Sequence, residues 1–123
     1  MSTMSVKVNL DRLADELANY AFAYLVTVGD DYHAHTVAVE PVLDAGVFDI
    51  GPVGGKTSGN LSAHPGVTLV WPPSERGGYT LIVDGHADGS QIKPLRAVLH
   101  RKAQQGQATK PGCKDDCHPL EQA

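Results

Sequence analysis

Apolar residues recur along the chain with two different spacings, and the first of them is helical. In residues 10–18, Leu10, Leu13 and Leu17 recur at every third or fourth position, which places them on one face of a helix. Asn9 stands directly before this run, and asparagine is a common residue at the start of a helix. The pattern predicts an amphipathic helix over residues 10–18 with Asn9 as its N-cap.

From residue 22 to about residue 100 the chain changes to short runs rich in β-branched and aromatic residues, separated by clusters of glycine, proline and aspartate. Such runs predict strands, and the clusters predict turns. Pro94 in the last run indicates a sheet edge or a β-bulge. We predict six strands, over residues 22–28, 33–42, 47–50, 67–71, 79–83 with an extension past Gly85, and 92–99.

One segment breaks the strand pattern in the middle of the chain. Residues 51–55 contain three glycines and a proline and cannot lie inside a strand. The polar residues that follow predict a short helix, which Thr57 or Ser58 caps and Pro65 ends. The segment is therefore expected to be a glycine loop that leads into a helix.

Six short strands with one helix before them and one between them predict a mainly β fold, either a small barrel or a sandwich. The length of 123 residues corresponds to one domain, which we place at residues 1–103. Residues 104–123 are polar and lack periodicity, so they are expected to form a surface tail. A barrel of this size leaves little interior space, so a ligand is expected at its rim or between subunits.

Composition narrows the classes of partner. The chain has 14 acidic and 10 basic residues and a net charge of −4, which gives no basic field for a nucleic-acid backbone. Its apolar stretches are much shorter than a bilayer span, and no basic N-terminal region precedes a long apolar run as in a signal peptide. We therefore expect a cytoplasmic protein that binds neither nucleic acid nor membrane.

The segment that begins at Gly54 contains the parts of an anion-binding site. Gly54 and Gly55 allow backbone N–H groups to approach a phosphate, and the start of a helix adds partial positive charge. Lys56 supplies a full charge, and Thr57 and Ser58 supply hydroxyl groups. The glycine spacing and the preceding meander differ from those of a P-loop. A phosphate site and a plain glycine loop with a solvated lysine both fit these residues.

Three segments follow one another along the chain at residues 31–39, 54–65 and 85–87. They read Asp-Tyr-His-Ala-His-Thr-Val-Ala-Val, Gly-Gly-Lys-Thr-Ser-Gly-Asn-Leu-Ser-Ala-His-Pro, and Gly-His-Ala. In order and spacing they resemble the pyridoxamine 5'-phosphate oxidase-like family of flavin-binding split barrels, whose cofactor loop reads Gly-Ser-Arg-Lys-x-x-Asn-Leu. The resemblance covers residues 22–100 and implies a six-stranded split β-barrel.

The resemblance implies a cofactor site with three parts, namely the glycine loop for the phosphate, the second strand for the flavin ring, and two further contacts. These parts are Gly54, Gly55, Lys56 and Thr57, then Thr36, Val37 and Ala38, and finally Asn60 and Trp71. The ring would lie near a dimer interface, and the apolar faces of the first two strands (Phe22, Tyr24, Val37, Val39) also indicate a homodimer. No catalytic residue is implied.

Two departures from the family pattern change what we expect of the site. Lys56 stands where the family usually has an arginine, and Thr57 stands where it has a second cation, so bidentate contact with the phosphate is lost. The sixth strand is followed only by the tail, so oxidation of pyridoxamine phosphate is not expected. We expect an oxidoreductase that uses FMN, or alternatively the deazaflavin coenzyme, on an unidentified small substrate. The alternative is a non-catalytic split barrel that binds a cofactor or haem.

The histidines and cysteines give weaker indications. His33 and His35 alternate along a predicted strand and would share a face, but no third ligand accompanies them, so no metal site is predicted. Cys113 and Cys117, with His118, lie in the tail. A disulfide, half of a zinc site, a redox pair and two exposed thiols all fit that spacing. A metal-binding or redox module in the tail is therefore a third functional class.

Overall fold

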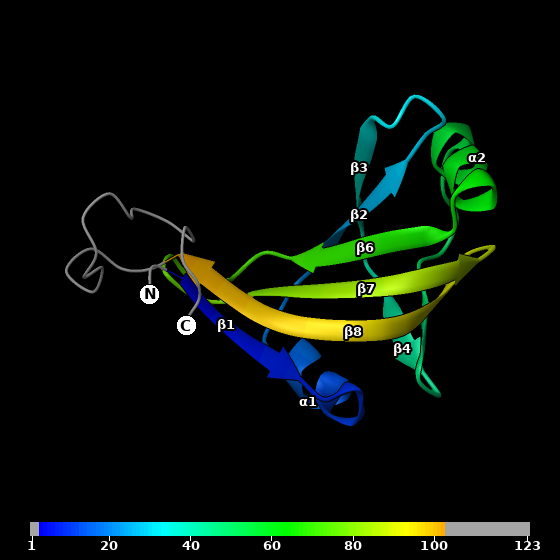
Figure 1. Cartoon of the computed structure of the whole chain (residues 1–123). Coiled ribbons are helices and arrows are strands. Elements are labelled where there is room, and N and C mark those ends of the chain that lie inside the picture. The colour runs from blue at the N-terminus through cyan, green and yellow to red at the C-terminus, as the bar shows by residue number, and fades with distance from the viewer. Residues whose placement is uncertain (1–2, 103–123) are drawn as a thin grey trace, which may run out of the picture.

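A computed structural model describes residues 3–102 of the chain (Figure 1). The fold is mainly β, as predicted, and consists of a curled antiparallel sheet with two short α-helices. The described residues form eight strands rather than six. The strands are β1 (Thr3–Val8), β2 (Ala23–Val28), β3 (Ala34–Val39), β4 (Val42–Asp44), β5 (Val47–Asp49), β6 (Gly66–Trp71), β7 (Thr80–Asp88) and β8 (Gln91–Lys102). The helices are α1 (Leu13–Leu17), preceded by a 3-10 turn η1 (Leu10–Arg12), and α2 (Gly55–Ala63).

The two additional strands have different origins. β1 pairs antiparallel with the second half of β8, from Thr3 opposite Lys102 to Val8 opposite Ala97. β4 arises because the predicted strand 33–42 is interrupted at Pro41, since proline has no N–H to donate to a neighbouring strand. The rest of the predicted strand pattern is confirmed.

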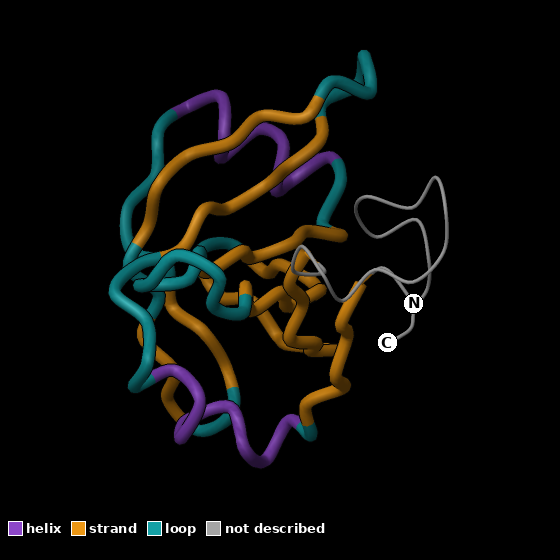
Figure 2. The backbone as a smooth tube through the Cα atoms, turned by 90° about the vertical axis from the view of Figure 1, so that its left-hand side faces the viewer, coloured by secondary structure: helices purple, strands orange, loops and turns teal. Residues whose placement is uncertain are grey.

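The strand order is β3-β2-β6-β7-β8-β5-β4, and β1 joins the sheet on β8. β3 and β4 therefore stand at opposite ends of the order although they follow one another in the chain. The sheet curls so that these two edges approach each other, which gives a half-open, split barrel (Figures 1 and 2). The helices lie at opposite ends of the molecule, α2 beside the β2–β3 hairpin and α1 at the other end.

The core follows the alternation of side chains in the central strands. Leu25, Leu69, Val83 and Ala97 are register partners across β2, β6, β7 and β8, and all four are buried. Trp71 also lies in this core, 3% exposed. Its ring packs 5.3 Å from that of Phe48.

Of the two alternatives predicted for Pro94, a sheet edge or a β-bulge, the structure shows the bulge. The register of β7 and β8 shifts between Asp84 and Gly85, and Gly85 lies opposite Pro94. A Cβ at Gly85 would lie 2.6 Å from Cγ2 of Ile92 and 2.8 Å from the carbonyl oxygen of Lys93. The two strands therefore approach so closely at this point that only glycine fits.

The N-terminal helix is shorter than the predicted 10–18. Asn9 has an extended backbone, and its carbonyl oxygen accepts the N–H of Arg12 at 2.9 Å, but its side chain forms no cap. Leu13 is buried, whereas Leu10 is 41% exposed. The amphipathic face is thus only partly used to bind the helix to the sheet.

Candidate functional site

Helix α2 begins at the predicted glycine loop, but its cap differs from the prediction. The N-cap is Gly54, not Thr57 or Ser58, and no side chain caps this end. The N–H of Ser58 donates to the carbonyl oxygen of Gly54 at 2.9 Å, so the three preceding N–H groups, of Gly55, Lys56 and Thr57, have no acceptor inside the helix. Such an end carries partial positive charge and can bind an anion.

The side chains of α2 divide between a buried and an exposed face. Thr57, Asn60 and Leu61 are buried, with 2%, 7% and 5% of their surfaces exposed, whereas Lys56 is exposed. Lys56 is the only lysine or arginine in residues 51–63. Of the side chains predicted to bind a phosphate, Lys56 is thus accessible, while the side chain of Thr57 is directed into the protein.

Asn60 attaches α2 to the β2–β3 hairpin. Its Nδ2 donates to Oγ1 of Thr27 at 3.0 Å, and Thr27 is fully buried. The Thr27 hydroxyl in turn donates to the carbonyl oxygen of His35 at 3.5 Å. The sequence suggested Asn60 as a cofactor contact, and in the structure its amide holds the helix in place.

The turn between β2 and β3 makes further contacts with α2. Nε2 of His64, the C-cap of α2, lies 2.7 Å from Oδ1 of Asp30. Asp31 accepts the backbone N–H of His33 at 3.0 Å and also lies 3.2 Å from Nδ1 of that histidine. This backbone hydrogen bond and the positive charge of Lys56 hold the pKa of Asp31 below its ordinary value of 3.8, against an opposing effect of desolvation.

His33 and His35 were predicted to lie on one face of the same strand, but in the structure only His35 belongs to that strand. His33 precedes β3 and lies in the turn, with a side chain that is 87% exposed. Within residues 3–102, no three histidine, cysteine, aspartate or glutamate side chains gather where they could hold a metal ion. Cys113, Cys117 and His118 lie outside the described residues.

The predicted ring-binding strand, β3, lies beside a cleft. Thr36 and Ala38 are exposed, whereas Val37 packs against the core. A cleft of about 370 Å³ is lined by Phe22, Ala38, Val39, Glu40, Ile50 and Pro52. Pro52 lies two residues before the N-cap of α2, so the segment that lines this cleft continues directly to the N-terminus of the helix. The structure therefore brings Ala38 and the glycine loop together and leaves Trp71 in the core.

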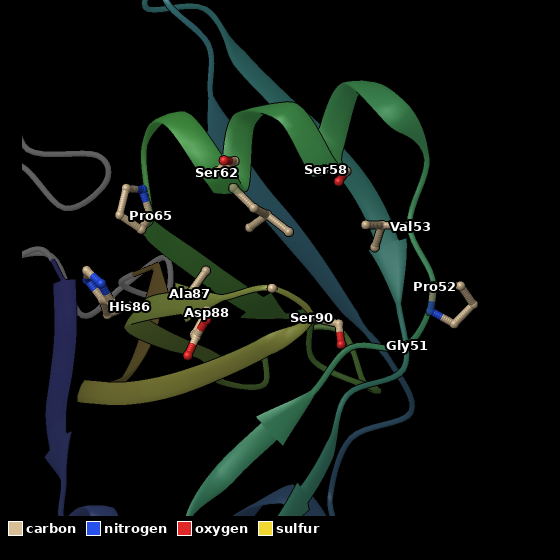
Figure 3. Close-up of a pocket in the computed structure, with 12 residues that line it drawn as sticks. Gly51, Pro52, Val53, Ser58, Ser62, Pro65, His86, Ala87, Asp88 and Ser90 are labelled. Atoms are coloured by element: carbon tan, nitrogen blue, oxygen red, sulfur yellow. The ribbon is translucent and has the colours of Figure 1, made fainter.

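A larger cleft of about 720 Å³ lies between α2 and the β7–β8 hairpin (Figure 3). It is lined by residues 51–53, by Ser58, Leu61, Ser62 and Pro65, and by residues 86–90. In Figure 3, Ser58 and Val53 point into this space from one side and Ala87 points toward α2 from the other. None of the nine predicted site residues lines it, and among its described lining residues there is no lysine or arginine. A sequence pattern could not reveal this cleft, because it forms between elements that are distant in the chain.

Comparison with known proteins gives two mycobacterial relatives of similar length. No family model matches the chain. The chain is 46% identical over 132 aligned positions to uncharacterized protein Mb0449c of Mycobacterium bovis and to uncharacterized protein MT0457 of Mycobacterium tuberculosis, covering 90% of this chain and 93% of each relative. The chain belongs to the family of these mycobacterial proteins.

Solved structures with a similar fold come from more distant proteins. A putative pyridoxamine 5'-phosphate oxidase from Corynebacterium glutamicum has a TM-score of 0.58 and 12% identity, over 85% of this chain and 98% of that one. An FAD-binding protein from Mesorhizobium loti has a TM-score of 0.55 and 14% identity, over 84% and 99%. An F420 reductase has a TM-score of 0.53 and 16% identity, over 73% and 92%. These similarities show that this chain shares the split-barrel fold of these proteins.

The structure also bears on the predicted relation to membranes. Among the described residues, no helix is both long and apolar enough to cross a bilayer.

Proposed function

We propose that this member of the family is an oxidoreductase that binds a flavin-type cofactor between β3 and the N-terminus of α2. The main supporting observation is that Pro52, which lines the cleft together with Ala38, lies only two residues before the N-cap of the uncapped helix that carries Lys56. The fold adds support, because similar solved structures are an F420 reductase, a putative pyridoxamine 5'-phosphate oxidase and an FAD-binding protein.

The residues present fit the phosphate end of such a cofactor. The N–H groups of Gly55, Lys56 and Thr57 have no acceptor inside the helix, and a phosphate oxygen is a suitable acceptor for them. The Lys56 ammonium adds a charge-assisted hydrogen bond. Since the Thr57 side chain is buried, its contribution in this proposal is limited to its backbone N–H.

The ring end fits the cleft beside β3. Thr36 and Ala38 present small exposed side chains on which a flat ring can lie, and Ala38 and Pro52 both line the cleft. Bound there, a flavin or deazaflavin supplies hydride transfer, and the protein orients the ring and excludes water. We propose FMN as the cofactor and the deazaflavin coenzyme as the alternative.

We further propose a homodimer, in which a second subunit completes the site. The cleft of about 370 Å³ is at the small end of the range for ligand pockets. An outward-facing row of Ala38, Tyr24, Val70, Ile82 and Val98 crosses five strands in register, and Tyr24 is 39% exposed. Such a row is suited to an interface between subunits.

Two of the residues that the sequence suggested for the dimer interface face the interior of the subunit instead. Val37 and Val39 pack against the core of their own subunit and do not belong to the outward row. Light scattering at micromolar concentration should give about twice the chain mass of 13.0 kDa. A species of 13.0 kDa alone would exclude the dimer.

Lys56→Ala tests the cofactor site directly. Loss of one charge-assisted contact should weaken FMN binding by about tenfold, measured by the quenching of flavin fluorescence. Lys7→Ala is the matched control, because Lys7 is an exposed lysine on β1, far from α2 (Figure 1). If the Lys56 variant and the wild type bind FMN with equal affinity, this loop does not bind the phosphate. A protein that binds FMN but whose bound flavin accepts no hydride would be the non-catalytic alternative.

A further inference from the structure

The larger cleft, between α2 and the β7–β8 hairpin, is not used by the proposed cofactor site. Its volume of about 720 Å³ lies within the usual range for ligand pockets. Pro52 is the one lining residue that it shares with the cleft beside β3. Its chemistry is therefore that of a second, separate site.

This cleft has an apolar wall and free hydroxyl groups. Leu61 and Ala87 are buried, with 5% and 6% of their surfaces exposed, and Ala87 points toward α2 from β7 (Figure 3). Ser58 and Ser62 stand one helical turn apart and are neighbours on the surface of α2. Neither hydroxyl forms a hydrogen bond with another residue of the described part of the chain. Both can therefore donate to a ligand or accept from it.

The charges around the cleft favour a cation. Asp88 and His86 are its only titratable lining residues, and Asp88 has no ion pair with another described residue. Lys93 lies opposite His86 on β8 but does not line the cleft. The C-terminal end of α2 adds partial negative charge. The Leu61 carbonyl oxygen lacks a helical donor there, because Pro65, four residues on, has no N–H.

We propose that this cleft binds a small organic cation, an amine with an apolar body. The apolar body packs against Leu61 and Ala87, and the ammonium donates to the serine hydroxyls. An ammonium has donors only, so hydroxyl and carbonyl oxygens are its suitable partners. A carboxylate of the same size finds no lysine or arginine among the lining residues and is repelled by Asp88. The proposal is independent of the cofactor site, because neither Lys56 nor its neighbouring glycines line this cleft.

Three compounds with the same aromatic body test the preference for a cation. Tyramine, tyrosol and hydroxyphenylacetate end in an ammonium, a hydroxyl and a carboxylate group. Each is titrated into the full chain, and binding is followed by NMR of the backbone amides. We expect tyramine to bind about threefold more tightly than tyrosol and about tenfold more tightly than hydroxyphenylacetate, with the largest shifts at Ser58, Ser62 and Ala87. Equal affinities, no saturable binding, or tyramine shifts spread over the whole surface would overturn the proposal.

Ser62→Phe tests the location of the site, and Ala63→Phe is its matched control. Both residues are exposed on α2, but only Ser62 lines the cleft. The same added ring should therefore weaken tyramine binding by at least about tenfold at position 62 and by less than about twofold at position 63. Circular dichroism checks that both variants remain folded. Undiminished binding to a folded Ser62→Phe variant would place the ligand elsewhere and overturn the site.

Asp88→Asn tests the contribution of the charge. It should weaken tyramine binding by about threefold and leave tyrosol binding unchanged, because only the cation interacts with the carboxylate. Asp11→Asn is the control, since it removes the same charge from η1, near α1 at the other end of the molecule (Figure 1), and should change neither affinity. Equal effects of the two substitutions on tyramine would mean that it senses only the net charge of the protein, which contradicts the proposal.

Discussion

The β7–β8 and β2–β3 hairpins belong to one sheet but are held in different ways. β7 and β8 pair from Thr80 opposite His100 to Asp88 opposite Gln91, and strands flank this hairpin on both sides. β3 is an edge strand whose outward residues are exposed. The β2–β3 hairpin makes two polar contacts with α2, through Asn60 and through His64.

Because of this difference, the residues that matter most for stability and the residues of the proposed site lie in different parts of the molecule. A hairpin held by close packing tolerates no added volume, whereas polar contacts depend on single donor and acceptor atoms. All residues proposed to bind a cofactor lie on or next to the β2–β3 hairpin and α2. Substitutions there can therefore change the site while the packed part of the sheet remains folded.

The largest effect is expected at Gly85. Gly85→Ala places a methyl group against Ile92 and the backbone of Lys93 and should lower the free energy of unfolding by about 2 kcal/mol, measured by urea denaturation. Gly59→Ala is the control, because nothing lies within 4 Å of its Cβ position. This substitution, in a helix, should stabilise the protein by about 0.5 kcal/mol. Equal stability of the two variants would show that the β7–β8 contact relaxes.

A slightly smaller effect is expected at Thr27. Thr27→Val keeps the shape of the side chain but removes the acceptor for the buried Asn60 amide, which should cost about 1.5 kcal/mol. Thr68→Val is the control, because the Thr68 hydroxyl donates to Asp84 at a half-buried position and its loss should cost about 0.5 kcal/mol. Thermal unfolding of both variants decides the order, and a larger loss for Thr68→Val would contradict the polar attachment of α2.

The turns of the two hairpins should respond in opposite directions. Gly89 in the β7–β8 turn has φ +60°, and Tyr32 in the β2–β3 turn has φ +64°, a region that costs a residue with a side chain about 1 kcal/mol. Gly89→Ala should therefore destabilise the protein by about 1 kcal/mol. Tyr32→Gly should stabilise it by about 0.5 kcal/mol, because the relief of strain is partly offset by a more flexible unfolded chain. A loss of stability in Tyr32→Gly, measured by urea denaturation, would mean that the exposed Tyr32 ring has a role in folding.

The smallest effect concerns pH and Asp31. Because its pKa is lowered in the folded protein, the folded state binds fewer protons than the unfolded state near that value, so acid weakens the contribution of Asp31. The stabilisation is present above the ordinary value of 3.8 and is lost as the pH falls through the lower folded value. The difference in melting temperature between the wild type and Asp31→Asn should be constant at neutral pH and decrease below about pH 4. A difference that increases on acidification would contradict this sign.

The sequence predicted best those elements whose pattern is local. The strand at 67–71 and the bulge at Pro94 were found with small changes of boundary, since hydrophobic alternation and a proline are visible in a short window. β1 was not predicted, because residues 3–8 become a strand through pairing with residues of β8 that lie far away along the chain, from Thr3 opposite Lys102 to Val8 opposite Ala97.

The candidate site was predicted in part for the same reason. Lys56 and the glycine loop are apparent from residue type alone. The burial of Thr57 depends on where α2 begins, and the N-cap at Gly54 turns this side chain toward the core. The contact of Asn60 with Thr27 joins residues 33 positions apart, and no local pattern encodes it.

The short link between β3 and β4 gives the split barrel a fixed hinge. Only Glu40 and Pro41 separate the last residue of β3 from the first residue of β4, so their Cα atoms can be at most about 11 Å apart. The two edges of the sheet are thus tethered at this end, next to Glu40 in the wall of the β3 cleft. If the gap between the edge strands β3 and β4 widens, the movement must therefore be a rotation about residues 40 and 41. The displacement is then largest at the end of the gap that is farthest from these two residues.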